Sequence, residues 1–158
     1  MVYHIADINS KYKVGDIILP KIYNMESFSL RKREIEICLE NVRKERFSSY
    51  PSRLHCLYVC YCIDDVHFWL HMKKEHIETD FKLLILDLEH EPVWLSSESY
   101  HKYYFGFSDD LEKCAHLYWS SKGAPEELDD CEGLYYGKAI VKRICKMRYT
   151  ENNDIIPI

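Results

Sequence analysis

One stretch of the chain predicts a buried strand that runs directly into a short helix: residues 50–74, YPSRLHCLYVCYCIDDVHFWLHMKK. A Pro-Ser pair interrupts regular structure near its start, and residues 53–62 are rich in the aromatic, β-branched and cysteine residues typical of strands. Two successive aspartates follow and suit the first turn of a helix, after which apolar residues recur at helical spacing. The stretch therefore places Tyr58 on the strand and Trp69 on the helix.

Two aromatic side chains placed in this way suggest a hypothesis about binding. An aromatic on a strand and another on the next helix can close on a flat ring from two sides, so Tyr58 and Trp69 are candidate ligand contacts. The alternative is that both side chains fill core volume, which is the commoner role of any single aromatic residue. This stretch by itself leaves both interpretations open.

The remaining elements are interspersed strands and helices of modest length. The sequence predicts strands over residues 2–8, 17–19, 81–88, 93–95 and 132–146, and helices from Ser27 or Ser29 to about Arg46 and from Leu111 to about Ser121. Strands and helices do not alternate regularly as in a doubly wound fold, and no GxGxxG or P-loop motif is present. We therefore expect a single α+β domain over residues 1–150, followed by a loose C-terminal tail over residues 151–158.

Two of the predicted strands carry features that bear on a site. In the first strand, alternation places His4 on the same face as Val2 and Ala6. In the last strand, Glu132 is the opening residue, and Gly137 indicates a bulge or a point of close approach. Each of these strands therefore carries one candidate site residue, His4 or Glu132.

Composition and charge favour a globular protein of the cytoplasm. Residues 1–74 hold 12 Lys and Arg against 9 Asp and Glu, whereas the remainder holds 9 against 17. The net charge of −5 does not favour tight nonspecific nucleic-acid binding, although the basic helix before Arg46 permits an anionic ligand. Seven cysteines without framework spacing predict reduced thiols. No secretory signal is expected, nor a membrane span, which needs roughly 18 apolar residues in succession.

Metal and thiol chemistry have little support in the sequence. Cys60 and Cys62 lie on the same side of a strand with one residue between them, unlike the usual C-x2-C zinc knuckle. His67 and His71 stand four residues apart, but no HExxH motif accompanies them. No local pattern singles out one cysteine as a nucleophile. We therefore expect no metal site.

Four residues from distant parts of the chain occur in an informative order: His4, Tyr58, Trp69 and Glu132. Considered singly, each has a structural explanation, as a half-buried histidine, core aromatics or a rim carboxylate. In this order they resemble the ADP-ribosyltransferase superfamily in its His-Tyr-Glu branch. There a YHxx strand carries the His, an aliphatic-Tyr strand precedes a helix with a second aromatic, and an E-x-L strand carries the Glu. The corresponding segments here are residues 3–6 (YHIA), 57–59 (LYV) with Trp69, and 132–134 (EGL).

The resemblance spans residues 3 to about 141. Residues 51–53 (PSR) and Gly137 also look like a group of small bacterial proteins of unknown function. Two departures stand out. The residues after Tyr58 are Val-Cys-Tyr, more hydrophobic than in a polymerase-type site, and Asp130 stands where arginine-specific members have Glu or Gln. The resemblance implies an ADP-ribosyltransferase-like split mixed sheet with short helices on its flanks.

The resemblance implies roles for these residues in the cleavage of NAD, which would be a substrate. Breaking the nicotinamide–ribose bond develops positive charge on the sugar, as in glycoside hydrolysis, and Glu132 would stabilise this charge through the ribose 2′-hydroxyl. His4 would bond the adenosine ribose, while Tyr58 and Trp69 would hold the nicotinamide. The implied catalytic residues are Glu132, His4 and Tyr58, and the implied NAD-binding residues are His4, Tyr3, Ser52, Arg53, Tyr58 and Trp69, with Ser52 or Arg53 at the pyrophosphate or the nicotinamide amide.

The implied function is that of an NAD-dependent ADP-ribosyltransferase that modifies a protein or a nucleic acid. Such an enzyme would serve as a bacterial toxin or phage-defence effector, restrained by an inhibitory protein partner as in toxin–antitoxin pairs, and would need neither metal nor membrane. Three alternatives stay open: an NAD glycohydrolase, an RNA 2′-phosphotransferase, and a non-enzymatic binding module on the same fold. Arg53 is the one basic residue near the strand, which argues against the phosphotransferase.

Overall fold

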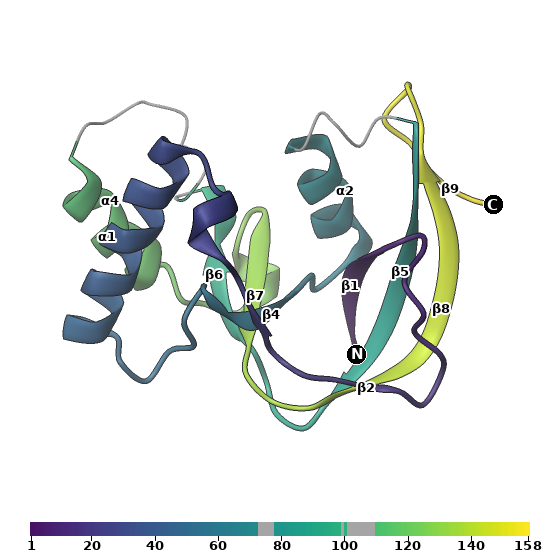
Figure 1. Ribbon diagram of the computed structural model, residues 1–158, viewed down its shortest axis with the longest axis horizontal. Coiled ribbons are helices and arrows are strands. Elements are labelled where there is room, and N and C mark those ends of the chain that lie inside the picture. The colour runs from purple at the N-terminus through teal and green to yellow at the C-terminus, as the bar shows by residue number, and fades with distance from the viewer. Residues whose placement is uncertain (73–77, 99, 101–109) are drawn as a thin grey trace. The chain divides into compact units, whose positions relative to one another are not determined.

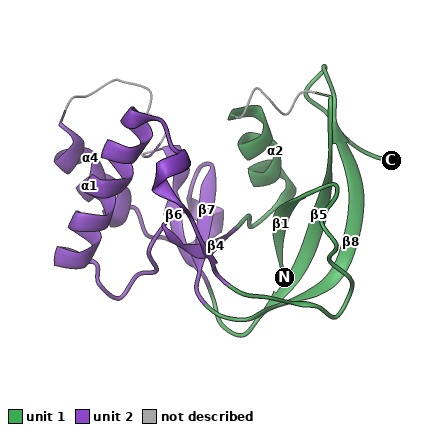
Figure 2. Cartoon of the chain, viewed as in Figure 1, with its two compact units in different colours: residues 1–19, 59–91, 137–158 green, residues 20–58, 92–136 purple. Residues whose placement is uncertain are grey.

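Two compact units make up the computed structural model, which describes residues 1–72, 78–98, 100 and 110–158 (Figure 1). Unit 1 is formed by residues 1–19, 59–91 and 137–158, and unit 2 by residues 20–58 and 92–136 (Figure 2). Each unit combines segments that are far apart in the sequence, so neither unit is one continuous stretch of chain.

Unit 1 contains a five-stranded sheet in the order β1-β5-β8-β2, with β9 paired to β8. All of these pairings are antiparallel. The strands are β1 (Val2–Asp7), β2 (Ile17–Ile18), β5 (Thr79–Leu88), β8 (Ala139–Tyr149) and β9 (Ile155–Pro157). The apolar FKLLILDL segment lies within β5, between β1 and β8, and four of its eight residues are buried.

One face of this sheet is covered by α2 (Ile63–Met72). The cluster that joins them contains Val66 and Leu70 of α2 and Phe81 and Leu83 of β5. Tyr3 and Ile5 pack against the same cluster, so alternation along β1 directs His4 to the opposite face of the sheet. His4 is buried there together with Val2 and Ala6, which confirms that these three residues share a face.

Unit 2 contains a four-stranded sheet in the order β3-β4-β7-β6, together with the helices α1 and α4, which lie side by side (Figure 1). Its elements are β3 (Lys21–Ile22), α1 (Leu30–Arg46), β4 (His55–Val59), β6 (Val93–Ser96), α4 (Leu111–Ser120) and β7 (Cys131–Tyr135), with short 3-10 helices at Met25–Ser27 and Pro125–Glu127. All five residues of β7 are buried, so a polar side chain on this strand must find its partners inside the protein.

The two helices of this unit pack through an apolar stripe on α1. Ile35 and Leu39, four residues apart, share a buried cluster with Ala115 and Trp119 of α4. The indole Nε1 of Trp119 donates a hydrogen bond to the carbonyl of Leu39 at 2.8 Å. This contact fixes α1 in register against α4, so the neighbouring Glu36 is held in the interior as well.

The observed elements confirm an α+β fold and correct two predictions. Residues 132–146 do not form one strand, because β7 ends at Tyr135 and the chain bends at Gly137 before β8 begins in the other unit. Apolar alternation continues on both sides of the bend, which is why the pattern suggested a single strand. The C-terminal tail is not loose, since Ile155–Pro157 form β9 and pair with the end of β8.

The amino-terminal cap of α1 resolves the choice between two serines. Ser29 accepts a hydrogen bond from the backbone N–H of Lys32 at 3.3 Å, whereas the Ser27 hydroxyl donates to the carbonyl of Asn24 at 2.8 Å. We expect Ser29→Ala to lower the free energy of unfolding by about 1 kcal/mol, because an N–H of the first turn loses its acceptor. Urea denaturation measures this loss. A larger loss in the control variant Ser27→Ala would contradict the assignment of the cap.

Candidate functional site

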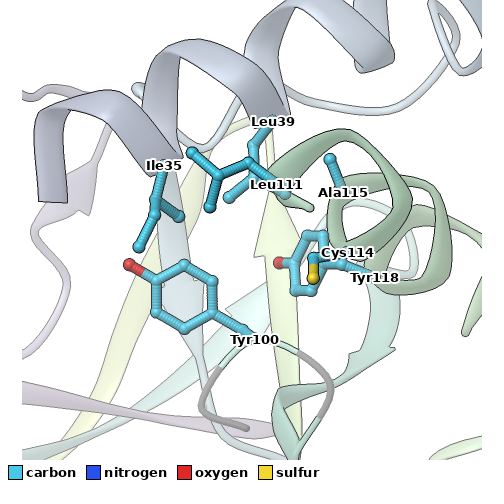
Figure 3. Close-up of a pocket in the computed structure, with 7 residues that line it drawn as sticks. All are labelled: Ile35, Leu39, Tyr100, Leu111, Cys114, Ala115 and Tyr118. Atoms are coloured by element: carbon cyan, nitrogen blue, oxygen red, sulfur yellow. The ribbon is translucent and has the colours of Figure 1, made fainter. Parts of the chain in front are cut away.

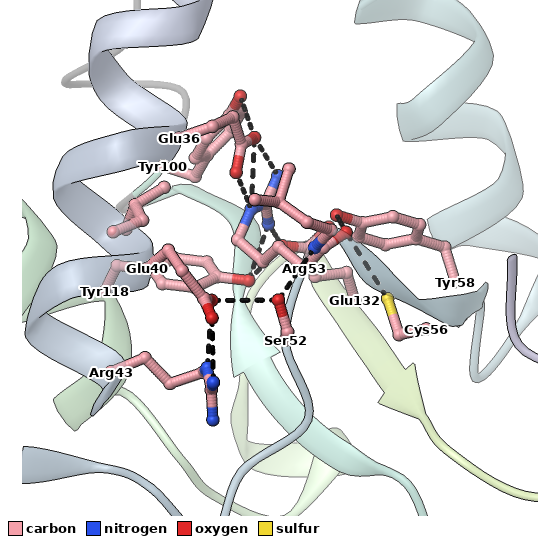
Figure 4. A network of polar contacts seen from close by, with 12 residues as sticks. Glu36, Glu40, Arg43, Ser52, Arg53, Cys56, Tyr58, Tyr100, Tyr118 and Glu132 are labelled. Atoms are coloured by element: carbon pink, nitrogen blue, oxygen red, sulfur yellow. Dashed lines mark hydrogen bonds and ion pairs between the residues drawn. The ribbon is translucent and has the colours of Figure 1, made fainter. Parts of the chain in front are cut away.

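A buried arginine lies at the centre of a polar network in unit 2 (Figure 4). Arg53 lies two residues before the start of β4, and its guanidinium lies between Glu36 of α1 and Glu132 of β7. Its Nε and Nη2 donate to the Glu36 carboxylate at 3.1 and 3.2 Å, and its Nη1 forms an ion pair with Oε1 of Glu132. The network therefore joins a helix to two neighbouring strands of the sheet.

Three tyrosines surround the guanidinium. Tyr118 accepts a hydrogen bond from Nη1 at 2.7 Å and donates one to Oε1 of Glu132. Tyr100 donates to Oε1 of Glu36 at 3.0 Å, and Tyr58 donates to the carbonyl of the arginine at 2.9 Å. The ring centres lie 4.1 Å (Tyr100), 5.0 Å (Tyr118) and 5.4 Å (Tyr58) from the guanidinium carbon, within the range of cation–π attraction. Hydrogen bonds and aromatic rings thus hold the same cation.

The three charged side chains are almost completely removed from solvent. Glu36, Arg53 and Glu132 are 3%, 6% and 1% exposed. Burial acts to lower the pKa of Arg53, but the adjacent carboxylates of Glu132 and Glu36 outweigh it, so this pKa lies well above its ordinary value. The guanidinium is therefore a permanent positive charge between two acidic side chains, an arrangement that proteins tolerate only when the charges are paired and hydrogen-bonded.

One oxygen of Glu132 has no hydrogen-bond partner among the described residues. Its Oε1 is taken by Arg53 and Tyr118, whereas its Oε2 is buried and accepts nothing. Buried polar atoms of native proteins nearly always have a partner, and the exceptions call for a specific explanation such as a catalytic role or a bound water. Oε2 is therefore the oxygen of this carboxylate that calls for such an explanation.

A comparison with known protein families matches residues 21–147 to a family described as a protein of unknown function, DUF2441. The chain belongs to the DUF2441 family. The matched residues include Arg53, Tyr58, Trp69 and Glu132, whereas Tyr3 and His4 lie outside the match. A search of curated proteins gave no match.

Three of the predicted site residues of this DUF2441 chain lie together in the network: Arg53, Tyr58 and Glu132. Tyr58 and Glu132 come from β4 and β7, which are neighbours in the sheet. Ser52 instead donates its hydroxyl to Oε2 of Glu40 at 2.8 Å. Ser52 and Arg53 are both committed to protein partners, which does not support the expectation that one of them contacts the pyrophosphate or the nicotinamide amide.

The other predicted site residues, Tyr3, His4 and Trp69, lie in unit 1. Tyr3 and Trp69 pack against the apolar cluster of α2, whereas His4 is buried on the opposite face of β1. Unit 1 therefore does not bring His4 and Trp69 to the same face of its sheet. Tyr58 and Glu132 belong to unit 2, so the convergence of all four motif residues on one site stays a prediction.

The network also contains residues that the sequence pattern does not single out: Glu36, Tyr100 and Tyr118. One signal points to Glu36, because it stands beside Ile35 and three residues before Leu39, on the packed side of a helix. A carboxylate in that position is almost never fully buried unless it is paired. Tyr118 lies on the buried side of its helix, but nothing local identifies the partners of its hydroxyl group.

An apolar pocket lies between α1 and α4 (Figure 3). It is lined by Ile35, Leu39, Tyr100, Leu111, Cys114, Ala115 and Tyr118. Its volume is about 10 Å³, which is room for about one water molecule. A nicotinamide ring does not fit, so this pocket does not identify a ligand site in the DUF2441 chain.

Three further observations concern the cysteine thiols, possible metal ligands and the length of the helices. All seven cysteines, which lie in the described part of the chain, are free thiols. Within the described residues, no group of three or more His, Cys, Asp and Glu side chains is placed to hold a metal ion. None of the helices in that same part of the chain is both long and apolar enough to cross a membrane.

The buried thiol and tyrosine hydroxyl groups around Arg53 predict a loss of stability at alkaline pH. Burial raises the pKa of Cys56 to about 12, and it raises the pKa values of Tyr58 and Tyr118 well above their ordinary value. Such a group keeps its proton in the folded protein after the unfolded chain has released it, so the unfolded state binds fewer protons and stability falls as pH rises. Each group contributes a slope of about 1.4 kcal/mol per pH unit.

We therefore expect the free energy of unfolding to decrease between about pH 9, where the Cys56 thiol ionises in the unfolded chain, and about pH 12. Urea denaturation at a series of pH values measures the slope. Cys56→Ala should flatten the first part of this decrease, before the tyrosines begin to ionise in the unfolded chain. A stability that stays level across the window would contradict the prediction.

Proposed function

We propose that this DUF2441 chain is an NAD-dependent ADP-ribosyltransferase of the His-Tyr-Glu type, with Glu132 as its catalytic carboxylate. One observation carries the proposal: the buried carboxylate of Glu132 has one oxygen held by Arg53 and Tyr118, and the other has no partner among the residues that the structure describes. The four motif residues occur along the chain in an order that resembles the order in that branch. This resemblance is the reason for proposing NAD as the substrate.

A carboxylate in this state suits the cleavage of the nicotinamide–ribose bond. As the bond breaks, nicotinamide leaves with the bonding electron pair and positive charge develops on the ribose. Oε2 of Glu132 would accept a hydrogen bond from the ribose 2′-hydroxyl and stabilise that charge more in the transition state than in the ground state. The acceptor nucleophile then forms the new bond to the ribose carbon and loses its proton to solvent.

The proposal also includes the split sheet of the superfamily and the route by which NAD reaches Glu132. His4 lies on the sheet of unit 1, and Tyr58 and Glu132 lie on the sheet of unit 2, which supports an ADP-ribosyltransferase-like split sheet. In this proposal Tyr58 contacts the nicotinamide, whereas the contacts of His4 with the adenosine ribose and of Trp69 with the nicotinamide stay predictions from the resemblance. Glu132 is 1% exposed, so NAD reaches Oε2 only after covering side chains move.

The proposed acceptor is a protein or a nucleic acid. The proposed setting is a bacterial toxin or phage-defence effector in the cytoplasm, restrained by an inhibitory protein partner. Water as the acceptor would make the chain an NAD glycohydrolase, and an RNA 2′-phosphate would make it a phosphotransferase. These alternatives, and a binding module without NAD chemistry, are separate outcomes of the experiment.

The release of nicotinamide from NAD by the purified protein tests the proposal, with Glu132→Gln as the matched variant. Isotopically labelled NAD, incubated with candidate proteins, RNA and DNA, then identifies the acceptor by a mass increase of one ADP-ribose unit. Free labelled ADP-ribose would identify water as the acceptor. Absence of nicotinamide release with every acceptor, or equal release by both proteins, would overturn the proposal.

A further inference from the structure

We infer that Arg53 is a positioning residue for Glu132: with Tyr118 it holds Oε1 and thereby directs Oε2 toward the ribose of NAD. This inference rests on the proposed function and adds a role that the motif resemblance does not contain. It also replaces the expected contact of Arg53 with the pyrophosphate, because Nε, Nη1 and Nη2 all donate to protein partners.

Oε1 of Glu132 accepts hydrogen bonds from two donors that belong to different elements. The guanidinium of Arg53 reaches Oε1 from the segment before β4, and the hydroxyl of Tyr118 reaches the same oxygen from α4. Two donors from separate elements on one oxygen restrict the rotation of the carboxylate. A free glutamate side chain samples several rotamers, so restricting it in advance favours the productive geometry of the reaction.

Arg53 is itself held from the other side. Nε and Nη2 donate to both oxygens of Glu36, and Tyr100 donates to one of them. Two parallel hydrogen bonds between guanidinium and carboxylate fix the orientation of the arginine plane more strictly than a single contact does. The contacts from Glu36 through Arg53 to Glu132 are therefore a fixed support for Oε1, and they leave Oε2 without a partner in the described part of the chain.

Arg53→Lys tests the inference because it keeps the positive charge but cannot form the fork of hydrogen bonds to two carboxylates. We expect kcat for nicotinamide release to fall about 10²-fold, with the KM for NAD little changed, since a misplaced group of this kind mainly affects the chemical step. The control is Arg43→Lys: Arg43 forms the same kind of paired contact, with Glu40 at 2.8 and 2.9 Å, away from Glu132. Its kcat should match that of the wild type.

A second pair of variants distinguishes an effect on the position of Glu132 from an effect on the packing of the network. Tyr118→Phe removes the hydroxyl on Oε1 of Glu132, whereas Tyr100→Phe removes a hydroxyl on Glu36 and leaves Glu132 untouched. We expect Tyr118→Phe to lower kcat about tenfold or more, because it deletes a hydrogen bond to a charged group, and Tyr100→Phe to lower it less. Circular dichroism of all variants confirms that they are folded.

The outcomes distinguish the inference from the function on which it rests. If Glu132→Gln loses activity while Arg53→Lys keeps the wild-type kcat, the positioning role is overturned and the proposed function stands. Equal losses in Arg53→Lys and Arg43→Lys would also overturn it, because the effect would then follow stability instead of the position of Glu132. If the wild type releases no nicotinamide, the proposed function is overturned and the inference with it.

Discussion

Arg53→Met is expected to lower the free energy of unfolding by about 3–5 kcal/mol, the cost of removing one partner from a buried ion pair. Methionine keeps much of the side-chain volume but leaves Glu36 and Glu132, at 3% and 1% exposed, without the cation between them. Urea denaturation followed by circular dichroism measures the loss. The control is Arg148→Met, since Arg148 pairs with Asp80 through side chains that are 42% and 30% exposed, where a much smaller loss is expected.

A compensated variant separates the charge effect from lost packing. Combining Arg53→Met with Glu36→Gln and Glu132→Gln removes both uncompensated charges, while the amide oxygens still accept from the two tyrosine hydroxyls. This triple variant should recover most of the lost stability, because a buried ionic cluster can be replaced by neutral side chains at little cost. A triple variant as unstable as Arg53→Met alone would assign the loss to packing around the guanidinium.

The fold could be predicted where its cause is local. Alternation along β1 correctly grouped His4 with Val2 and Ala6, and the aspartates after β4 marked the start of α2. The prediction of one strand over residues 132–146 was wrong because alternation carries no information about which sheet a strand enters. Only the pairing of β7 with its neighbours in unit 2, and of β8 with β5 in unit 1, shows that the chain changes sheet at Gly137.

The candidate site could be predicted only in part, because its contacts are not local. Glu132 and Tyr58 were identifiable from the order of motifs, but Arg53 pairs with Glu36, 17 residues away, and with Glu132, 79 residues away. An arginine that becomes buried needs carboxylate partners, yet the sequence offers 26 acidic residues and no pattern that ranks them. The partners of Arg53 are settled by the packing of α1 against the sheet of unit 2 and by the pairing of β4 with β7, which a linear pattern does not contain.

Glu132→Gln is expected to lower the rate of nicotinamide release by about 10²–10³-fold, which corresponds to about 2.7–4 kcal/mol of transition-state stabilisation. Glutamine has nearly the same shape and keeps an oxygen that can accept from Arg53 and Tyr118, but it carries no negative charge to oppose the charge that develops on the ribose. The interaction strengthens as the bond breaks, so kcat should fall while the KM for NAD changes little. Steady-state nicotinamide release measures both constants.

The decisive comparison is with Glu36→Gln. That variant removes one negative charge from the same network and from the same guanidinium, but it leaves both oxygens of Glu132 in place. If Oε2 of Glu132 performs the chemistry, Glu36→Gln should lose much less activity than Glu132→Gln, because only the support of Arg53 is weakened. Losses of equal size would mean that activity depends on the charge balance around Arg53, and the unpartnered oxygen would then have no special role in the reaction.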